Sequence, residues 1–295
     1  MRVFVTGATG FVGSTVVQEL IQAGHQVLGL ARSDAGAKLL AGLEAGVYRG
    51  DMDDLESLRG GAATVDGVIH TAFNHDFSKF AENCEQDRRA IEMLGDVLAG
   101  SNRPLLVTSG VGVMTGRTAT ENDPPVPPSA TYPRASEATA LALVERGVRA
   151  SVVRLPQVHD RFKQGLVTYA IALAREKGVA AYIGEGLNRW SAVHLLDAAR
   201  LYRLALEKGT AGARYHAVAE EGVSAREIAE AIGRGLKVPV VSKSSEEANE
   251  HFGWLARFAG FDLPASSAIT QEQLGWRPTG VGLIDDLDHM EYFPA

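Results

Sequence analysis

The chain has 295 residues, of which 45% are hydrophobic and 22% charged, as in an ordinary folded globular protein. Its formal charge of −7 argues against nucleic acid and anionic membrane as main partners, because both require a basic surface. The single cysteine, Cys84, excludes an intrachain disulfide, and no apolar run reaches the roughly eighteen residues of a membrane span. No targeting segment precedes the first predicted strand, so we expect a cytoplasmic protein.

The first thirteen residues carry the most informative pattern. Residues 3–5 predict a short buried strand, and Gly7, Gly10 and Gly13 follow at intervals of three. Residues 14–23 then carry apolar side chains at helical spacing. Between a strand and a helix, such glycines allow a tight turn, a close approach of backbone to a pyrophosphate, and close packing of helix on strand. An ordinary turn with spare glycines is the alternative; the flanking elements favour a dinucleotide site.

Strand and helix signals alternate through the rest of the first half. This alternation predicts a mostly parallel sheet with helices on both faces, an α/β fold. Residues 116–131 hold four of the eleven prolines and predict a loop at the edge of the site. The predicted strands are 26–30, 46–48, 67–71, 104–108 and 148–155, and the predicted helices are 34–44, 53–59, about 77–98 and about 133–146.

The second half is less regular. A capping box, Ser224 with Glu227, marks one helix start. The predicted helices are about 163–177, 194–208, 224–236 and 245–259, and the predicted strands are about 180–183, 214–218 and 239–241.

Five segments give the whole chain a family resemblance. Residues 6–13 (TGATGFVG) resemble the TGxxGxxG signature of extended short-chain dehydrogenases/reductases, the epimerase/dehydratase-like group. The likeness continues in Gly-Asp-Met at 50–52, His-Thr-Ala at 70–72, Arg-Leu-Pro at 154–156 and Leu-Gly-Trp at 274–276. It implies a Rossmann-type doubly wound parallel sheet with a smaller C-terminal substrate-binding portion. We expect residues 1–158, joined by about 193–218, to bind the cofactor, and 159–295 to be mostly the substrate-binding portion.

The resemblance also implies a nicotinamide cofactor, and the end of the second strand indicates which one. No acid stands there to bind a ribose hydroxyl and repel a 2′-phosphate. Arg32 and Ser33 can instead bind a phosphate, so we predict NADPH; a solvated Arg32 is the alternative. Asp51 and Met52 match the segment that holds adenine, although Asp51 also suits a turn. The remaining implied cofactor contacts are Thr6, Gly7, Thr9, Gly10, Phe11, Val12, Gly13, Thr71, Ala72, Phe73, Pro156 and Val158.

The predicted active site departs from the family pattern. The family uses a tyrosine as acid/base, a lysine four residues later, and a hydroxyl from the preceding strand end. Here Tyr132 is present, but Ser136 stands at the lysine position and cannot supply a positive charge. Ser109 is our choice for the hydroxyl, although Gly110 can occupy that register. Arg134 is a possible substitute cation, but on a regular helix it would point away from Tyr132.

Three roles for Tyr132 therefore compete: proton donor, wall of the substrate pocket, and structural residue. The predicted substrate-binding residues are His75, His159, Arg189 and Trp190, with backbone-bonded, solvated or core roles as alternatives. The histidines are scattered and no HExxH or CxxC spacing occurs, so we expect no metal site.

The leading hypothesis is an NADPH-dependent reductase of a small, fairly apolar carbonyl compound. A sugar-nucleotide epimerase or dehydratase and an NADP(H)-sensing regulator without turnover are the alternatives. The resemblance makes a homodimer through helices about 77–99 and 133–146 an expectation, and no nucleic acid or membrane partner is expected.

Overall fold

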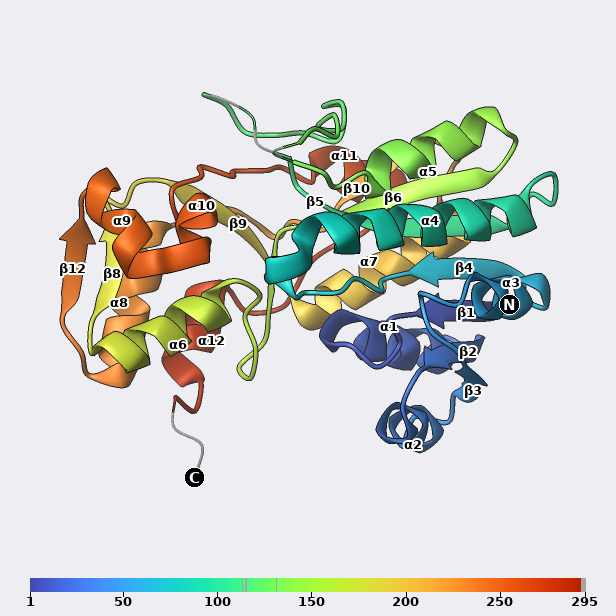
Figure 1. Ribbon diagram of the computed structural model, residues 1–295, viewed down its shortest axis with the longest axis horizontal. Coiled ribbons are helices and arrows are strands. Elements are labelled where there is room, and N and C mark those ends of the chain that lie inside the picture. The colour runs from blue at the N-terminus through green and yellow to red at the C-terminus, as the bar shows by residue number, and fades with distance from the viewer. Residues whose placement is uncertain (113, 115, 131, 293–295) are drawn as a thin grey trace.

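The computed structural model describes residues 1–112, 114, 116–130 and 132–292, and its centre is a seven-stranded sheet (Figure 1). The strand order is β10-β6-β5-β4-β1-β2-β3, and every pairing is parallel. This is the doubly wound Rossmann order with one added strand, as predicted. The strands are β1 (Arg2–Thr6), β2 (Gln26–Ala31), β3 (Gly46–Arg49), β4 (Gly67–His70), β5 (Pro104–Gly110), β6 (Arg149–Leu155) and β10 (Arg214–His216).

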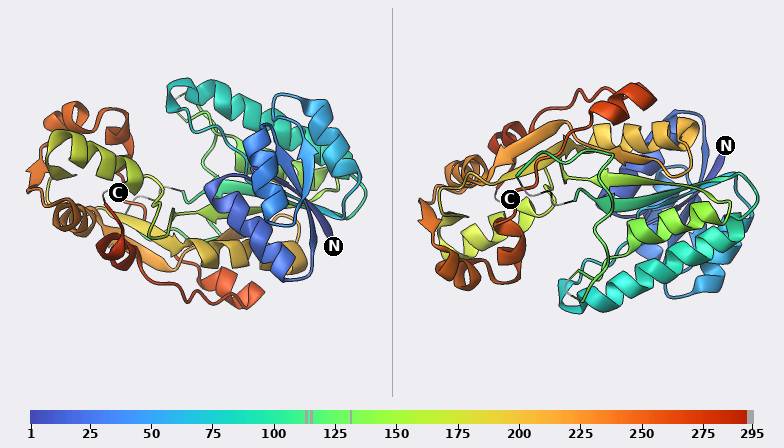
Figure 2. Two further views of the ribbon diagram at one scale, coloured as in Figure 1. Left: turned by 90° about the horizontal axis from the view of Figure 1, so that it is seen from below. Right: turned by 90° about the horizontal axis from the view of Figure 1, so that it is seen from above.

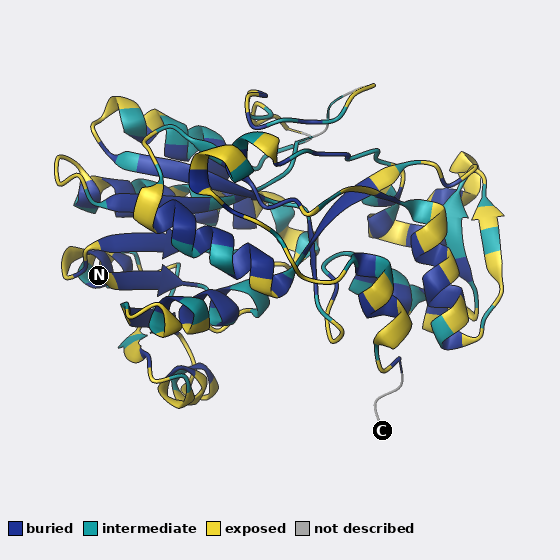
Figure 3. Cartoon of the chain, turned by 180° about the vertical axis from the view of Figure 1, so that it is seen from behind, coloured by how far each residue is buried: buried dark blue, intermediate teal, exposed yellow. Residues whose placement is uncertain are grey.

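Helices cover both faces of this sheet because its strands are apolar on both sides. Val3 and Val5 of β1 face the core with α1 and α7, whereas Phe4 faces the opposite core with α3, α4 and α5. The buried strands form the dark-blue centre of Figure 3. The helices are α1 (Phe11–Gln22), α2 (Asp34–Gly42), α3 (Leu55–Ala63), α4 (Phe80–Leu98), α5 (Ser136–Glu145) and α7 (Leu195–Lys208), with the short helix η1 (Phe77–Lys79) before α4.

The C-terminal portion gathers at one end of the molecule, as Figure 2 shows in olive and orange. It holds two small sheets, β11-β9-β7 and β12-β8, and has two apolar clusters of its own. Its strands are β7 (Gln157–His159), β8 (Ala180–Ile183), β9 (Arg189–His194), β11 (Glu220–Ser224) and β12 (Val240–Lys243). Its helices are α6 (Val167–Lys177), α8 (Ala225–Leu236), α9 (Ser245–Phe252), η2 (Gly253–Leu255), α10 (Ala256–Ala259) and α12 (Leu283–His289). The helix α11 (Ala268–Leu274) packs instead against β10 and α7 of the sheet half.

Several predicted elements need correction. The helix predicted at 133–146 begins only at Ser136, because the Tyr132 backbone N–H donates to Ser129 O (3.1 Å) in a preceding turn. The helix predicted at 245–259 breaks at Gly253, whose φ of 54° lies in the left-handed region that glycine tolerates. Strands β7, β9 and β11 were not predicted separately. The capping box of Ser224 and Glu227 is confirmed.

Cys84 is buried in α4, as predicted for a core residue. None of the helices in the described ranges is long and apolar enough to cross a membrane.

Candidate active site

The glycine turn after β1 leaves no room for side chains. Gly7 has φ +68°, and a Cβ added to it would lie 2.6 Å from the Ala72 backbone nitrogen. A Cβ on Gly13 would lie 2.1 Å from Gly7 O. These approaches press the first turn of α1 onto the carboxyl ends of β1 and β4, which explains why glycine stands at both positions.

The N-terminus of α1 is open to an anion. Its cap is Gly10, which has no side chain to satisfy the first N–H groups, and the first turn, wholly within the described residues, contains no acid. Such an end carries partial positive charge and unpaired donors. The pyrophosphate of a dinucleotide fits this site, because glycine lets it approach and the N–H groups of Phe11 and Val12 can bind it.

Thr6 supports this turn from inside. Its side chain is fully buried, and its Oγ1 lies 2.7 Å from His70 Nδ1. Thr71 Oγ1 donates to Thr6 O (2.7 Å), and the Ala72 N–H donates to Thr6 Oγ1 (3.4 Å). The prediction that Thr6 contacts the cofactor is therefore corrected: its hydroxyl points into the protein and ties β1 to β4.

The end of β2 presents an exposed cation. Arg32 is exposed, and within the described chain its guanidinium makes no hydrogen bond or ion pair. Ser33 caps α2, because its Oγ accepts from the Gly36 N–H (3.1 Å). Asp34 pairs with Arg49 (2.8 Å), so this acid is partly neutralised. A phosphate can reach Arg32, and the hydroxyl of Ser33 keeps a hydrogen that it can donate to the same phosphate while it caps the helix.

The other predicted cofactor residues lie along the same edge of the sheet. Asp51 follows β3, and its Oδ1 accepts from the Asp53 N–H (3.1 Å), so the turn role is present; an adenine contact by Asp51 and Met52 stays a prediction. Thr9 is exposed beside the glycine turn. Pro156 and Val158 lie where β6 passes into β7, and because the Val158 side chain is in the core, only its backbone can contact a cofactor.

A small cavity opens at the carboxyl end of β5. Ser109, Tyr132 and Arg134 line it together with the prolines of the 116–131 loop. Burial raises the pKa of Tyr132, and nearby Arg134 acts in the opposite direction. The phenol is therefore fully protonated at neutral pH and available as a proton donor. Gly110 lines the same cavity as Ser109. Which of the two occupies the position of the family's hydroxyl therefore stays a prediction, and Ser109 is the one with a hydroxyl to offer.

Ser136 does not face this cavity. It is 1% exposed, and its Oγ donates to Asp87 Oδ2 (2.5 Å) and accepts from Arg134 Nε (3.0 Å). The prediction of Ser136 as a catalytic residue is corrected: its hydroxyl is used inside the protein. The expectation that Arg134 points away from Tyr132 is also wrong in its premise. Residues 132–135 precede α5, so helical spacing does not apply to them.

A buried ion pair forms the floor of the cavity, and sequence reasoning missed it. Arg154 of β6 donates through Nε and Nη2 to the Glu137 carboxylate (2.9 and 2.6 Å). Arg154 Nη2 also donates to Asp123 O (2.7 Å), which ties the proline-rich loop to the sheet. The family-like segment Arg-Leu-Pro at 154–156 marked this strand in the sequence. The partner of Arg154, Glu137, is known only from the folded structure.

Of the four predicted substrate residues, His75 and Arg189 lie at the surface, whereas His159 and Trp190 are buried. His75 is exposed beside the site and packs edge-on against Phe73 (5.5 Å between ring centroids). His159 is fully buried, and its Nδ1 donates to Asp286 (2.7 Å), so the prediction of a substrate contact is wrong for it. Trp190 belongs to the C-terminal core, and the same correction applies. Arg189 pairs with Asp262 (2.8 Å) at the surface.

Aromatic side chains bridge the two halves of the molecule. Phe77 of η1 stacks on Trp254 of η2 (4.8 Å, 16° between ring planes), and Phe258 approaches Phe77 as well (6.1 Å). Tyr169 of α6 packs edge-on against Trp254 (5.0 Å). These ring contacts form an apolar cluster where η1 of the sheet half meets α6, η2 and α10 of the C-terminal portion.

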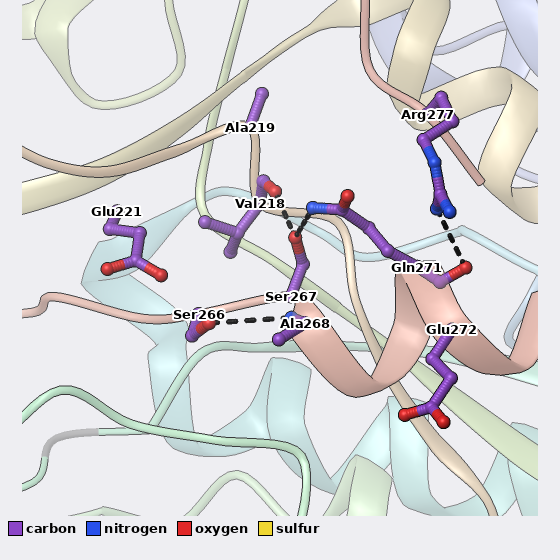
Figure 4. Close-up of a pocket in the computed structure, with 9 residues that line it drawn as sticks. All are labelled: Val218, Ala219, Glu221, Ser266, Ser267, Ala268, Gln271, Glu272 and Arg277. Atoms are coloured by element: carbon purple, nitrogen blue, oxygen red, sulfur yellow. Dashed lines mark hydrogen bonds between the residues drawn. The ribbon is translucent and has the colours of Figure 1, made fainter. Parts of the chain in front are cut away.

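A larger cavity, about 430 Å³, lies elsewhere, between the chain after β10 and the start of α11 (Figure 4). Some of its polar groups are bonded to one another: Ser267 Oγ donates to Val218 O (2.6 Å) and accepts from Gln271 (3.0 Å). Neither the glycine turn nor Tyr132 lines it, so it has no part in the candidate active site.

Comparison with known proteins identifies the family. The model of the NAD dependent epimerase/dehydratase family matches residues 3–219, so the chain belongs to this family, the extended short-chain dehydrogenases/reductases. It is 51% identical over 298 residues to an uncharacterized protein of Schizosaccharomyces pombe, covering 99% of this chain and 100% of that protein. It is 29% identical to a decarboxylating sterol-4-alpha-carboxylate 3-dehydrogenase of Dictyostelium discoideum over 76% of this chain and 73% of that protein.

Solved structures agree with the fold. A dTDP-glucose 4,6-dehydratase from Streptomyces venezuelae, bound to NAD and TYD, superposes with a TM-score of 0.79 and 22% identity, covering 98% of this chain and 95% of that one. A UDP-glucose 4-epimerase from Thermus thermophilus in complex with NAD gives 0.76 at 21% identity, over 98% and 97%. At these identities the likeness concerns the fold, and the family is one of NAD(P)-dependent enzymes.

Proposed function

We propose that this protein is an NADPH-dependent oxidoreductase that reduces the carbonyl group of a small, fairly apolar molecule. The observation that carries the proposal is the cavity shared by Ser109, Tyr132 and Arg134 at the carboxyl edge of the sheet. Substrates of doubly wound folds bind at this edge. The epimerase and dehydratase names of the structural relatives belong to those proteins.

Bound NADPH supplies the hydride. Tyr132 would donate its phenolic proton to the carbonyl oxygen of the substrate, and the reduced product would be an alcohol. Ser109 donates a hydrogen bond to the same oxygen and orients it. The phenol begins the reaction protonated because burial raises the pKa of Tyr132.

Two features support the choice of cofactor and substrate. The exposed Arg32 supports NADPH, because its planar guanidinium matches a 2′-phosphate. The aromatic cluster of Phe77, Trp254 and Phe258, where the sheet half meets the C-terminal portion, supports an apolar substrate, because aromatic faces favour apolar and ring-bearing molecules. We also propose a cytoplasmic homodimer that pairs through α4 and α5, which light scattering can test.

The test follows NADPH oxidation across a panel of aliphatic and aromatic aldehydes and ketones, with NADH in parallel. We expect turnover with NADPH and little with NADH. Tyr132→Phe should lower kcat by roughly 10²–10⁴-fold, the usual contribution of a positioned acid, while NADPH binding is retained. Tight NADPH binding without turnover would support a sensor instead, and release of bound NAD on denaturation would support an epimerase.

A further inference from the structure

Arg134 is held in place from three directions at the carboxyl edge of the sheet. Its Nε donates to Ser136 Oγ (3.0 Å), and its Nη2 approaches Thr108 O (3.5 Å). Its Cζ lies 4.4 Å from the centre of the Phe73 ring, a cation–π contact. Phe73 follows Ala72, which touches the glycine turn, so the guanidinium lies between the predicted cofactor site and the cavity of Tyr132.

A buried chain of hydrogen bonds leads from Arg134 back to the glycine turn. Ser136 Oγ donates to Asp87 Oδ2 (2.5 Å), and His70 Nε2 donates to Asp87 Oδ1 (3.0 Å). His70 Nδ1 lies 2.7 Å from Thr6 Oγ1, and Thr6 directly precedes Gly7. All four residues are at most 1% exposed.

A buried carboxylate at the middle of this chain needs compensation. Charged groups removed from water are costly unless they are paired or well bonded. Asp87 receives one hydrogen bond on each oxygen, and the second donor, Ser136, is the residue that contacts Arg134. The hydroxyl therefore transmits the position of the carboxylate to the guanidinium, which a side chain without an acceptor at position 136 would not do.

We propose that Arg134 supplies the active-site cation beside Tyr132 and that Asp87, acting through Ser136, is the positioning residue that holds it there. This inference rests on the proposed function for its meaning in turnover. It explains how a chain with serine four residues after the tyrosine retains a charge at the site: the cation comes from the turn before α5, and the serine anchors it.

The charges that face the phenol are consistent with this role. Besides burial, which raises the pKa of Tyr132, the neighbouring groups are Arg134 in the preceding turn, Cys84 of α4, Glu137 of α5 and Arg257 of α10. The two arginines lower the pKa, whereas Cys84 and Glu137 raise it, and Arg134 has the largest effect of the four. Without Arg134, burial, Cys84 and Glu137 would still raise the pKa of Tyr132, and of the four neighbouring groups Arg257 alone would lower it.

The primary experiment titrates Tyr132 in the cofactor-free protein. Tyrosinate absorbance is recorded against pH, and the curve of a Tyr132→Phe variant is subtracted to isolate the one phenol. We expect Arg134→Gln to move the Tyr132 transition to higher pH and Arg134→Lys, which keeps the charge, to move it less. Arg146→Gln is the matched control, since Arg146 lies at the other end of α5 and pairs with Asp96 at the surface.

An unchanged Tyr132 transition in Arg134→Gln, or an equal change in Arg146→Gln, would overturn the proposal. Because this titration needs neither cofactor nor substrate, its result stands even if no carbonyl compound is reduced. Where turnover is found, Arg134→Gln should also lower kcat by at least about tenfold, within the usual range for assisting a proton donor.

The role of the buried chain is tested by a double-mutant cycle. Ser136→Ala keeps Asp87 in place and cuts the link, so it should move the Tyr132 transition in the same direction as Arg134→Gln. Asp87→Asn should do the same, and Ser136→Ala remains informative if the Asp87 variant fails to fold. In the Ser136→Ala/Arg134→Gln double variant the transition should equal that of Arg134→Gln alone. Additive shifts would show that Ser136 acts independently of Arg134 and would refute the positioning role.

Discussion

The seven-stranded sheet and the C-terminal portion are built on different kinds of interaction. In the sheet half, the site is made largely of backbone: Gly7, Gly13 and the open end of α1 form it, and their geometry follows from strand–turn–helix connectivity. In the C-terminal portion, short strands and broken helices are held by particular side chains, such as His159 on Asp286 and Tyr169 on Trp254. A motif that works through backbone can be recognised in sequence, whereas one that works through side-chain partners cannot.

The candidate active site lies where these two kinds of interaction meet. Its cofactor edge is fixed by the sheet, and on the side of the C-terminal portion η2 and α10 contact η1 through aromatic rings. Cofactor binding should therefore depend on a few glycines, and substrate selection on a distributed set of apolar contacts. Changes placed in one half or the other test this division.

The largest effect is expected from Gly13→Ala. The added Cβ would lie 2.1 Å from Gly7 O, a backbone atom that cannot move without opening the turn. The first turn of α1 should move off β1, and NADPH affinity should fall by two orders of magnitude or more, about 3 kcal/mol of binding free energy. NADPH fluorescence titration measures the affinity, and circular dichroism checks that the fold remains.

Gly42→Ala is the matched control. Gly42 ends α2 on the same half of the molecule, and a Cβ there meets nothing within 4 Å. Alanine should leave NADPH affinity unchanged and raise the free energy of unfolding by up to about 1 kcal/mol, because it loses less backbone entropy in a helix. Equal losses of affinity in the two variants would show that the glycine turn has no special role.

The division also explains which predictions from the sequence succeeded. The parallel sheet followed from the alternation of strand and helix signals, because each strand is buried on both faces and each crossover is a helix. The glycine turn followed from the spacing of its glycines, and the doubly wound order was implied by the family resemblance. The position of Arg134 did not follow. Helical spacing was applied to residues 132–136, but the turn between Ser129 and Tyr132 delays α5 to Ser136.

The roles of buried polar residues were equally inaccessible. Nothing in the spacing of His70, Asp87 and Ser136 shows that they form one chain, because they lie on three elements brought together only by packing. His159 and Trp190 were predicted to bind substrate from their places next to family-like segments, with solvated or core roles as alternatives, yet both are buried in the C-terminal portion. Local patterns predict which element a residue belongs to, and long-range contacts decide its role.

A pH effect is expected at the seam between the halves. His216 of β10 is fully buried, with Nδ1 donating to Ser266 O (2.8 Å) and Nε2 lying 3.1 Å from Arg154 Nη1. Burial, together with Arg154, lowers the pKa of His216 to about 4. Between roughly pH 6.5 and pH 4 the unfolded chain binds a proton that the folded chain does not, so stability is full above that window and falls as pH falls through it, by up to about 3 kcal/mol.

Urea unfolding at pH 7, 6 and 5 measures this loss. His216→Asn should be less stable at pH 7 but should depend less on pH, since the group that titrates is gone. His289→Asn, at an exposed position on α12, should keep the pH dependence of the unsubstituted protein. A His216→Asn variant with the original pH dependence would assign the effect to other groups.

Substitutions in the sheet half alone should change the preference for NADPH over NADH. Arg32→Ala removes an exposed guanidinium that faces a predicted 2′-phosphate, a contact of about 1.5–3 kcal/mol, or roughly tenfold or more in affinity. NADPH should bind more weakly and NADH about as before, which parallel fluorescence titrations will show. Arg49→Ala is a useful control, because Arg49 lies near the same edge but pairs with Asp34. Equal weakening of both cofactors by Arg32→Ala would contradict the NADPH assignment.

The smallest effect is expected on the other side of the site. Trp254 is 46% exposed and stacks on Phe77, so Trp254→Ala removes one ring pair between the halves, a contact of about 0.5–1.5 kcal/mol. We expect KM for aromatic carbonyl compounds to rise several-fold, with NADPH affinity unchanged, because the glycine turn is untouched. Leu187→Ala, also exposed in the C-terminal portion, controls for loss of a surface apolar group. If Trp254→Ala instead weakened NADPH as much as the substrate, cofactor and substrate binding would not be divided between the two halves, and the aromatic bridge would act on the whole site.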